Sequence, residues 1–270
     1  PFKDRTLAMI FAKPSARTRI SFETGFFRMG GHALYLGPND VGIGKRESVA
    51  DIARVVSRFN DVIMARLFSH QDIINLAKHS DVPVINGLTD FNHPCQIMAD
   101  LFTIYEKLGR YEDFKIAYIG DGNNIAGSLA LACSLAGMDF TISSPEKYRL
   151  PPDIWALATD ISSKNGTNLL WTPDPSQAVE NADVVYTDVW VSMGDEDEKE
   201  DRLNTFSSYQ INEKLVSKAK KDFIFMHDMP AHRGEEISQN MLDHDNSVVY
   251  QQAENRLHAQ KSILADLFGY

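Results

Sequence analysis

The sequence predicts an α/β protein made of two doubly wound parallel-sheet domains. Short apolar segments alternate with amphipathic segments of helical length along most of the 270 residues, and this alternation is typical of parallel sheets with helices on both faces. The chain is about twice as long as a typical domain, and the polar stretch GRYEDF (109–114) interrupts the alternation. We therefore expect two domains, with the active site at the carboxyl ends of strands in the interdomain cleft.

The first domain is expected to comprise residues 1–110. Buried strands are predicted by apolar runs at 6–12, 32–37, 61–67 and 83–88. Helices are predicted by apolar residues with a spacing near 3.6 and by polar starts at 17–29, 48–59, 71–79 and 93–108. A C-terminal helix, at about 253–270, is expected to complete this domain.

The second domain is expected to comprise residues 111–252. Its strands are predicted at 115–120, 139–143, 168–172, 183–190, 222–228 and 248–252. Its clearest helices are predicted at 124–136 and 152–164. The acidic stretch GDEDEKED (194–201) is expected to be a solvated loop.

Composition excludes several classes of function. The net charge of −10 argues against nucleic acid as the main partner, because phosphate backbones are bound by basic faces. No apolar run approaches the roughly 18 residues that a transmembrane helix needs, and the N-terminal residues lack the pattern of a signal peptide. Cys95 and Cys133 each fall in an expected helix, so a reducing compartment is expected rather than a disulfide framework.

An anion site is predicted where the first strand ends, in FAKPSARTRISFE (11–23). Ser15 is placed to cap a helix that has Arg17, Thr18 and Arg19 in its first turn. Free backbone N–H groups, the positive end of the helix dipole, hydroxyl groups and a guanidinium would then converge on a phosphate or carboxylate. The alternative is that Arg19 and Glu23, at i and i+4, form an ordinary helix pair.

A second candidate, FNHPCQ (91–96), also follows an expected strand. Pro94 holds His93 extended, and Gln96 falls in the first turn of the next helix. Histidine can polarise a carbonyl oxygen, and glutamine can accept a hydrogen bond from an amide NH₂. A His-Pro turn with a purely structural role is the alternative.

The third candidate is AYIGDGNNIAGS (117–128), in which a strand leads into a glycine-rich turn and a helix. Gly120 and Gly122 match the first two glycines of a dinucleotide fingerprint, but Ile125 occupies the place of the third. A nicotinamide enzyme is therefore a minor alternative. Asn123 or Asn124 could instead present its amide to a substrate.

Three later motifs add polar groups near strand ends. In YTDVWVSMG (186–194), Asp188 ends a strand and could bind a substrate amine, although capping a turn is the commoner role of such an Asp. In FMHDMPAHRGEEI (225–237), His227 and Asp228 suggest a catalytic pair or a charged surface turn. Arg256, in QQAENRLHAQ (251–260), has no meaning when it is considered alone.

The order of these motifs is more specific than any one of them. SARTR, an Arg after a strand (Arg66), HPCQ, GDGNN, DVWVSMG, HDMPAHRG and AENR follow one another along essentially the whole chain. This combination resembles the ornithine carbamoyltransferases, and the aspartate carbamoyltransferases share the first and third elements. Family members have a further N-terminal helix, so we expect the natural chain to begin upstream of Pro1.

The resemblance implies transfer of the carbamoyl group of carbamoyl phosphate to the δ-amine of L-ornithine. The products would be L-citrulline and phosphate, in arginine biosynthesis. No metal or organic cofactor is expected, because carbamoyl phosphate is already activated. The resemblance also implies a homotrimer in which GIGKRES (42–48) reaches a neighbouring subunit's site. The expected compartment is the cytoplasm, or an organellar matrix if a presequence has been removed.

The resemblance further implies a role for each candidate residue. Carbamoyl phosphate would be bound by Ser15, Ala16, Arg17, Thr18, Arg66, His93, Gln96, Asp228, Met229 and Arg256. Ornithine would be bound by Asn124, Asp188, Ser192 and Met193. Catalytic roles are implied for Arg66, His93, Asp188 and Asp228.

Two positions depart from the family pattern. Ala16 stands where the phosphate loop usually has Thr, which removes one hydroxyl. Asp228 stands where the family loop H-C-L-P has Cys beside the reacting amine. A carboxylate there would favour a protonated amine or act as a general base, so we expect an altered pH optimum, a reduced rate or a shifted amine preference. A carbamoyltransferase for another amine and a non-catalytic carbamoyl phosphate-binding relative are the alternatives.

Overall fold

A computed structural model describes residues 1–43, 46–192 and 196–270. The chain divides into two compact units, one formed by Pro1–Phe102 with Ala253–Tyr270 and the other by Thr103–Gln252. The chain passes between the units inside two helices, α5 (Pro94–Leu108) and α11 (Val249–Leu267). The first division therefore lies within α5, not at the polar stretch after it. No helix in the described ranges is long and apolar enough to cross a membrane.

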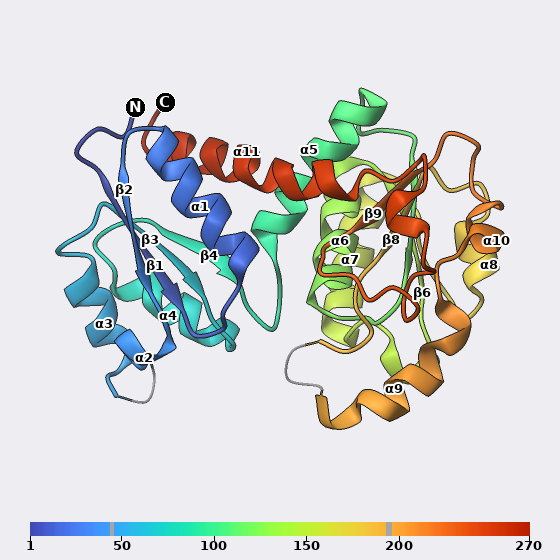
Figure 1. Cartoon of the computed structure of the whole chain (residues 1–270), viewed down its shortest axis with the longest axis horizontal. Coiled ribbons are helices and arrows are strands. Elements are labelled where there is room, and N and C mark those ends of the chain that lie inside the picture. Colours follow the sequence, from blue (N-terminus) through green and yellow to red (C-terminus); the bar gives the residue numbers. More distant parts are fainter. Residues whose placement is uncertain (44–45, 193–195) are drawn as a thin grey trace. The chain divides into compact units, whose positions relative to one another are not determined.

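The first unit has a four-stranded parallel sheet in the order β2-β1-β3-β4 (Figure 1). Its strands are β1 (Thr6–Phe11), β2 (His32–Leu36), β3 (Val62–Arg66) and β4 (Val84–Leu88). The helices wholly within it are α1 (Ala16–Arg28), α2 (Pro38–Val41), α3 (Val49–Val56) and α4 (His70–His79). The chain moves from β1 to β2 on one side and returns to β3 on the other, so the winding reverses between β1 and β3.

Both faces of this sheet are buried, as expected for a doubly wound unit. Leu7 and Met9 of β1 belong to one core cluster, together with Phe22 and Phe26 of α1. Ala8 and Ile10, which alternate with them, belong to a second cluster that includes residues of α3 and α4. Successive side chains of a strand point to opposite faces, which explains why the strand reads as a continuous apolar run.

The second unit has a five-stranded parallel sheet in the order β7-β6-β5-β8-β9. Its strands are β5 (Lys115–Ile119), β6 (Asp139–Ser143), β7 (Leu169–Thr172), β8 (Val184–Thr187) and β9 (Ile224–His227). Its helices are α6 (Asn124–Ala136), α7 (Pro152–Asn165), α8 (Pro175–Val179), α9 (Lys199–Phe206) and α10 (Glu213–Val216), with four short 3₁₀ segments at Glu146–Tyr148, Glu196–Glu198, Ser207–Tyr209 and Met241–Asp243. The winding reverses between β5 and β8.

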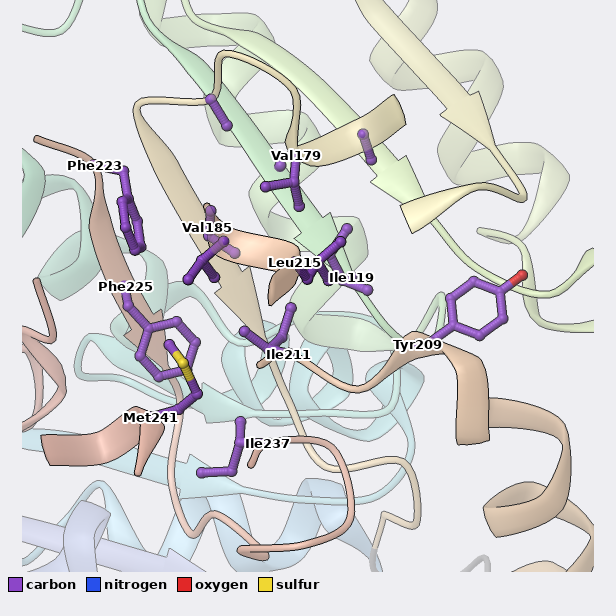
Figure 2. Packing of buried hydrophobic residues seen from close by; sticks show 14 of the residues in the cluster. Ile119, Val179, Val185, Tyr209, Ile211, Leu215, Phe223, Phe225, Ile237 and Met241 are labelled. Atoms are coloured by element: carbon purple, nitrogen blue, oxygen red, sulfur yellow. The ribbon is translucent and has the colours of Figure 1, made fainter. Parts of the chain in front are cut away.

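Apolar side chains from the sheet and from the later loops form the core of the second unit on one face of its sheet. Figure 2 shows residues of β5, β8 and β9 gathered with residues of α8 and α10 and with residues of the loops and 3₁₀ segments between the later elements. The labelled residues are Ile119, Val179, Val185, Tyr209, Ile211, Leu215, Phe223, Phe225, Ile237 and Met241. This packing fixes the carboxyl ends of β5, β8 and β9, from which polar loops emerge.

The predicted strand at 248–252 is wrong. Among the described residues, a single parallel bridge between Phe225 and Ser247 continues the sheet beyond β9, and α11 begins at Val249. Val249, Gln252 and Arg256 are buried on one face of this helix, at a helical spacing. A five-residue apolar and polar run is too short to separate this pattern from the alternation of a strand.

The acidic stretch 194–201 is also not simply a loop. Its last residues form the 3₁₀ segment Glu196–Glu198 and the start of α9. Arg202 and Phe206, four residues apart on α9, are both buried, so one face of the helix packs against the unit while its acidic residues face solvent. The predicted strand at 183–190 is confined to Val184–Thr187.

Candidate active site

In the first unit, the predicted anion site is at the N-terminus of α1, next to the reversal between β1 and β3. Ser15 is the N-cap and accepts a hydrogen bond from the Thr18 backbone N–H (3.4 Å). The Ser15 hydroxyl also donates to Thr18 Oγ1 (3.2 Å). The first N–H groups of an α-helix have no intrahelical acceptor, so this turn presents hydroxyl and N–H donors in a positive field.

Two buried guanidinium groups converge on the Thr18 hydroxyl. Arg66, the last residue of β3, donates from Nη1 to Thr18 Oγ1 (3.4 Å), and Arg256 of α11 donates from Nη2 to the same oxygen (3.1 Å). Arg66 and Arg256 are 7% and 3% exposed. Burying two cations side by side is costly, and a bound dianion would offset that cost.

His93 and Gln96 belong to the same cluster. Gln96, in the first turn of α5, accepts from Arg256 Nη1 (2.6 Å) and donates to Asp100 Oδ1 (2.9 Å). His93 directly precedes α5 and is fully buried. Burial, followed by the charges of Arg256 and Arg66, holds the pKa of His93 well below its ordinary value. A neutral imidazole therefore faces this group of cations near pH 7.

The remaining residues of the SARTR motif are on the surface. Ala16 and Arg17 are exposed in the first turn of α1. Arg19 forms an exposed ion pair with Glu23 (3.0 Å) and stacks over the Tyr35 ring, with 4.1 Å between its guanidinium carbon and the ring centroid. Arg19 thus makes the ordinary helix pair, whereas Arg66 and Arg256 supply the buried positive charge.

In the second unit, the polar groups gather at the reversal between β5 and β8. Asn123 caps α6 by accepting from the backbone N–H groups of Ile125 and Ala126, and its Nδ2 donates to Asp188 Oδ2 (2.9 Å). Asp188 follows β8 and is 6% exposed. Asn124, the residue implied by the resemblance, lies half-buried in the next position. The side chain that meets Asp188 is that of its neighbour.

Asp188 has a raised pKa, so its protonated and ionised forms coexist near neutral pH. Burial first, and then the negative charge of Asp228, raise the pKa of Asp188 to about 7. His227, the Val189 N–H and Asn123 act in the opposite direction. Asp228 follows β9 and is half-buried. The negative charge of Asp228 thus disfavours ionisation of Asp188.

His227 is a buried residue that orients the loop after β9. Its ring faces Glu236, with 3.1 Å between Nε2 and Oε1, and the Met229 backbone N–H donates to Nδ1 (2.8 Å). This second bond requires that Nε2 carry the proton, which it donates to Glu236. Met229 takes a positive φ of 61°. The sequence motif hinted at a His–Asp pair, but the partner of His227 is Glu236.

Gly122 argues against a dinucleotide in the turn after β5. A Cβ atom at Gly122 would lie 2.4 Å from the Arg149 carbonyl carbon and 2.5 Å from the Leu150 nitrogen. The Gly122 N–H also donates to the Tyr148 carbonyl (2.9 Å). Residues 148–150 thus occupy the close approach that a pyrophosphate would need, and Gly122 is required for chain packing.

Comparison with known families connects both units to one chemistry. Residues 1–106 match the carbamoyl phosphate-binding domain of the aspartate/ornithine carbamoyltransferases, and residues 112–267 match their aspartate/ornithine-binding domain. The chain belongs to the aspartate/ornithine carbamoyltransferase family.

Individual carbamoyltransferases agree over nearly the whole chain. An ornithine carbamoyltransferase of Thermococcus kodakarensis is 52% identical over 98% of this chain and 84% of its own. An anabolic ornithine carbamoyltransferase of Pyrococcus furiosus is 51% identical over 98% of this chain and 84% of its own. The solved structure of a Pyrococcus furiosus ornithine carbamoyltransferase has a TM-score of 0.96, with 50% identity, and covers 100% of this chain and 86% of its own.

The residues that the carbamoyltransferase resemblance implied thus form two groups, one within each unit. One group lies in the first unit: Ser15, Thr18, Arg66, His93, Gln96 and Arg256. The other lies in the second unit. It contains Asp188, whose pKa the charge of Asp228 raises, and Met229, whose backbone N–H donates to His227. Ser192 is half-buried in the loop after β8. Met193 lies outside the described residues, as do positions 44 and 45 of the stretch 42–48.

Three residues that contact these two groups, Asn123, Asp100 and Glu236, were not among the site residues that the resemblance implied. Asn123 was named only as an alternative to Asn124, and its place as the N-cap of α6 is the signal that separates the two. Asp100 lies one helical turn after Gln96, a spacing that predicts contact. Glu236 could not be paired with His227 from sequence, because it lies nine positions later, beyond an irregular loop.

One group among the described residues has donors that a metal ion could use. Atoms of His232, Glu235 and Glu236 lie within 4.8 Å of one another. Glu236 Oε1, however, already accepts from His227 and from the His232 backbone N–H. Cys95 is buried in α5, and burial raises the pKa of its thiol to about 11, so it remains protonated. That the reaction needs no metal or cofactor stays a prediction.

The raised pKa of Asp188 predicts a pH-dependent stability. A carboxyl group with a folded-state pKa near 7 and an unfolded value near 3.8 stabilises the fold below about pH 4, and this contribution is lost as the pH rises through 7. Asp188→Asn removes the titration. Between pH 5 and pH 8, we expect the melting temperature of the wild type to fall relative to that of Asp188→Asn.

Thermal unfolding at several pH values measures this difference. Asp222→Asn, which changes an exposed carboxylate just before β9, should follow the wild type. A constant difference between wild type and Asp188→Asn across this range would contradict a raised pKa.

Proposed function

We propose that this protein transfers the carbamoyl group of carbamoyl phosphate to the δ-amine of L-ornithine, giving L-citrulline and phosphate. The observation that supports this most directly is the convergence of two buried guanidinium groups on Thr18 at the N-terminus of α1. A phosphate dianion fits that arrangement, because it would neutralise both cations and accept from the free N–H groups of the helix. Ser15 and the backbone of Ala16 and Arg17 would complete the phosphate site.

On the carbamoyl side, the cluster would stabilise negative charge as it develops. When the amine attacks the carbamoyl carbon, a C–N bond forms and charge builds on the carbonyl oxygen. Arg66, Thr18 and the neutral ring of His93 would donate to that oxygen. The C–O bond to phosphate then breaks, and Arg66 and Arg256 would stabilise the leaving phosphate. Gln96 would hold the carbamoyl NH₂ through its carbonyl oxygen.

On the amine side, the second unit would bind ornithine. Asp188, when ionised, would accept from a substrate ammonium, and Asn123 would fix the direction of that carboxylate. Asn124, Ser192 and Met193 are proposed as further contacts. The δ-amine must be neutral to attack and must lose a proton as citrulline forms. Asp228 and Met229, on the loop held by His227 and Glu236, are proposed to lie beside this amine.

The chemistry requires both substrates to meet, so we propose that holding the two reactants in line supplies much of the rate. The Pyrococcus furiosus relative is named an anabolic enzyme, which supports the direction of arginine biosynthesis for this chain. A homotrimer, and a cytoplasmic or organellar location, are proposed on the family resemblance.

A screen of amine substrates tests the proposed function. Phosphate release from carbamoyl phosphate would be measured with L-ornithine, putrescine, an acylated ornithine and a shorter diamino acid, and citrulline would be identified directly. We expect turnover with ornithine to exceed that with each other amine by at least about 100-fold in kcat/KM. A preference for another amine would contradict the assignment of ornithine. Binding of carbamoyl phosphate without turnover of any amine would contradict catalysis altogether.

A further inference from the structure

Arg202 of α9 makes a buried ion pair with Asp121, which lies in the turn between β5 and α6. The distance from Arg202 Nη1 to Asp121 Oδ2 is 2.8 Å, and the two side chains are 10% and 12% exposed. Neither residue belongs to the groups assigned above to the two substrates. A buried ion pair is weak evidence for stability, because the cost of desolvation offsets much of the attraction. The pair therefore calls for another explanation.

The same guanidinium group contacts three further residues. Besides Asp121, Arg202 Nη1 donates to the Trp190 carbonyl oxygen (3.2 Å), and Nε donates to Glu198 Oε2 (3.2 Å). Its guanidinium carbon lies 4.8 Å from the centre of the Tyr148 ring. A planar fork with five donors can hold partners in several fixed directions at once, which a lysine ammonium cannot do on its single flexible stem.

Two of the segments that Arg202 contacts lead directly to the residues proposed for the amine site. Asp121 is followed by Gly122 and Asn123, and Asn123 donates to Asp188 Oδ2. Trp190 lies between Asp188 and Ser192 in sequence. Arg202 thus connects the turn that carries Asn123 to the segment that carries Asp188 and Ser192, on the two strands where the winding of this sheet reverses.

We propose that Arg202 is a positioning residue for the amine substrate. It fixes the Asn123 turn and the Asp188–Ser192 segment relative to each other, and it does so without touching the substrate. A buried charged contact is retained here for geometry, a use of such contacts that is known from other proteins. The inference rests on the proposed function, because the amine site is where its effect appears.

The proposal predicts a selective defect. Arg202→Met should raise the KM for ornithine by about tenfold or more, as loss of a supporting contact does in other sites. It should change the KM for carbamoyl phosphate by less than about twofold, because the buried cations Arg66 and Arg256 proposed for that ligand are in the first unit. Arg202→Lys keeps the charge opposite Asp121 and should recover part of the ornithine KM. Asp121→Asn removes the same ion pair from the other side and should reproduce the defect.

The matched control is Asp201→Asn, next to Arg202 on α9. Asp201 pairs with Lys147 at 3.3 Å, and both side chains are about two-thirds exposed, so this change should leave both KM values as in the wild type. Thermal unfolding of every variant separates folding from positioning. Should Arg202→Met fail to fold, Asp121→Asn and Arg202→Lys still test the proposal.

The outcomes distinguish the proposals from each other. Suppose that the wild type turns over ornithine. If Arg202→Met and Asp121→Asn leave the ornithine KM unchanged, or raise the KM values of both substrates equally, the positioning role is overturned and the proposed function stands. Wild type with no turnover of ornithine overturns both. A selective rise in the ornithine KM, partly recovered by Arg202→Lys, supports both.

Discussion

Arg66→Met is expected to lower kcat/KM for carbamoyl phosphate by about 10³-fold or more, in line with the loss of a group that stabilises both a bound anion and a developing oxyanion. Arg66 is buried, and it meets Arg256 at the Thr18 hydroxyl. Both charges also act on His93. Removing Arg66 therefore lowers the positive field at the phosphate, at the carbonyl oxygen and at the imidazole together.

Ligand-induced stabilisation gives a measurement that does not depend on turnover. A ligand at 100 times its Kd stabilises a protein by about 2.7 kcal/mol, so carbamoyl phosphate or inorganic phosphate should raise the melting temperature of the wild type. We expect this rise to be lost in Arg66→Met. The ligand-free variant should still fold, because methionine fills much of the same volume.

Arg19→Met is the control for charge alone. Arg19 lies in the same helix as Thr18 and carries the same positive charge as Arg66. Its side chain, however, is exposed, pairs with Glu23 and stacks over the ring of Tyr35. We expect Arg19→Met to keep the phosphate-induced rise in melting temperature and a kcat/KM within about threefold of the wild type. Equal losses in the two variants would mean that general positive charge, and not this cluster, binds phosphate.

The fold was largely predictable because the central strands β1, β3, β5 and β8 are buried on both faces. The expected helix 124–136 and the expected strand 139–143 match α6 and β6 residue for residue, since a central strand reads as one apolar run and Gly137 ends the helix before it. The error at 248–252 arose where a strand-like composition starts a helix. The segment is helical because α11 buries Val249 and Gln252 on one face. A run of five residues is too short to show this helical spacing.

The site was less predictable than the fold, because its contacts are distant in sequence. Arg256 meets Gln96 and Thr18 across 160 and 238 residues, so no local pattern distinguishes it from a surface arginine. Arg19, which the sequence places at the anion site as plausibly as Arg17, lies on the outer face of α1. Residue type predicted the kind of chemistry. Only the order of the strands shows which side chains of that type meet.

Asp228, which departs from the family pattern, affects the ionisation of Asp188. From sequence, a carboxylate in place of the family's cysteine predicted an altered pH dependence. In the structure, the negative charge of Asp228 is the second cause, after burial, of the raised pKa of Asp188. The effect of the departure is thus expected first on Asp188, whose ionised form is proposed to bind ornithine.

Asp228→Asn is therefore expected to move the acid limb of the pH profile toward lower pH. In the wild type, kcat/KM for ornithine should fall as the pH drops through about 7, the pKa of Asp188, because the protonated carboxyl no longer attracts the substrate ammonium. With Asp228 neutral, the pKa of Asp188 falls and the limb should shift by about one pH unit or more. Asp228→Cys should shift it in the same direction, since a thiol with an ordinary pKa near 8.5 is neutral there.

Citrulline formation measured between pH 5.5 and 9 would test this shift, with Asp222→Asn as the control. Asp222 lies six residues before Asp228 and is exposed, so its removal changes the net charge equally and should leave the acid limb in place. If the wild type, Asp228→Asn and Asp228→Cys give the same profile, Asp228 does not set the ionisation of the amine site. If the limb moves and the plateau also falls by about 100-fold in Asp228→Asn, Asp228 additionally accepts the proton that the attacking amine loses.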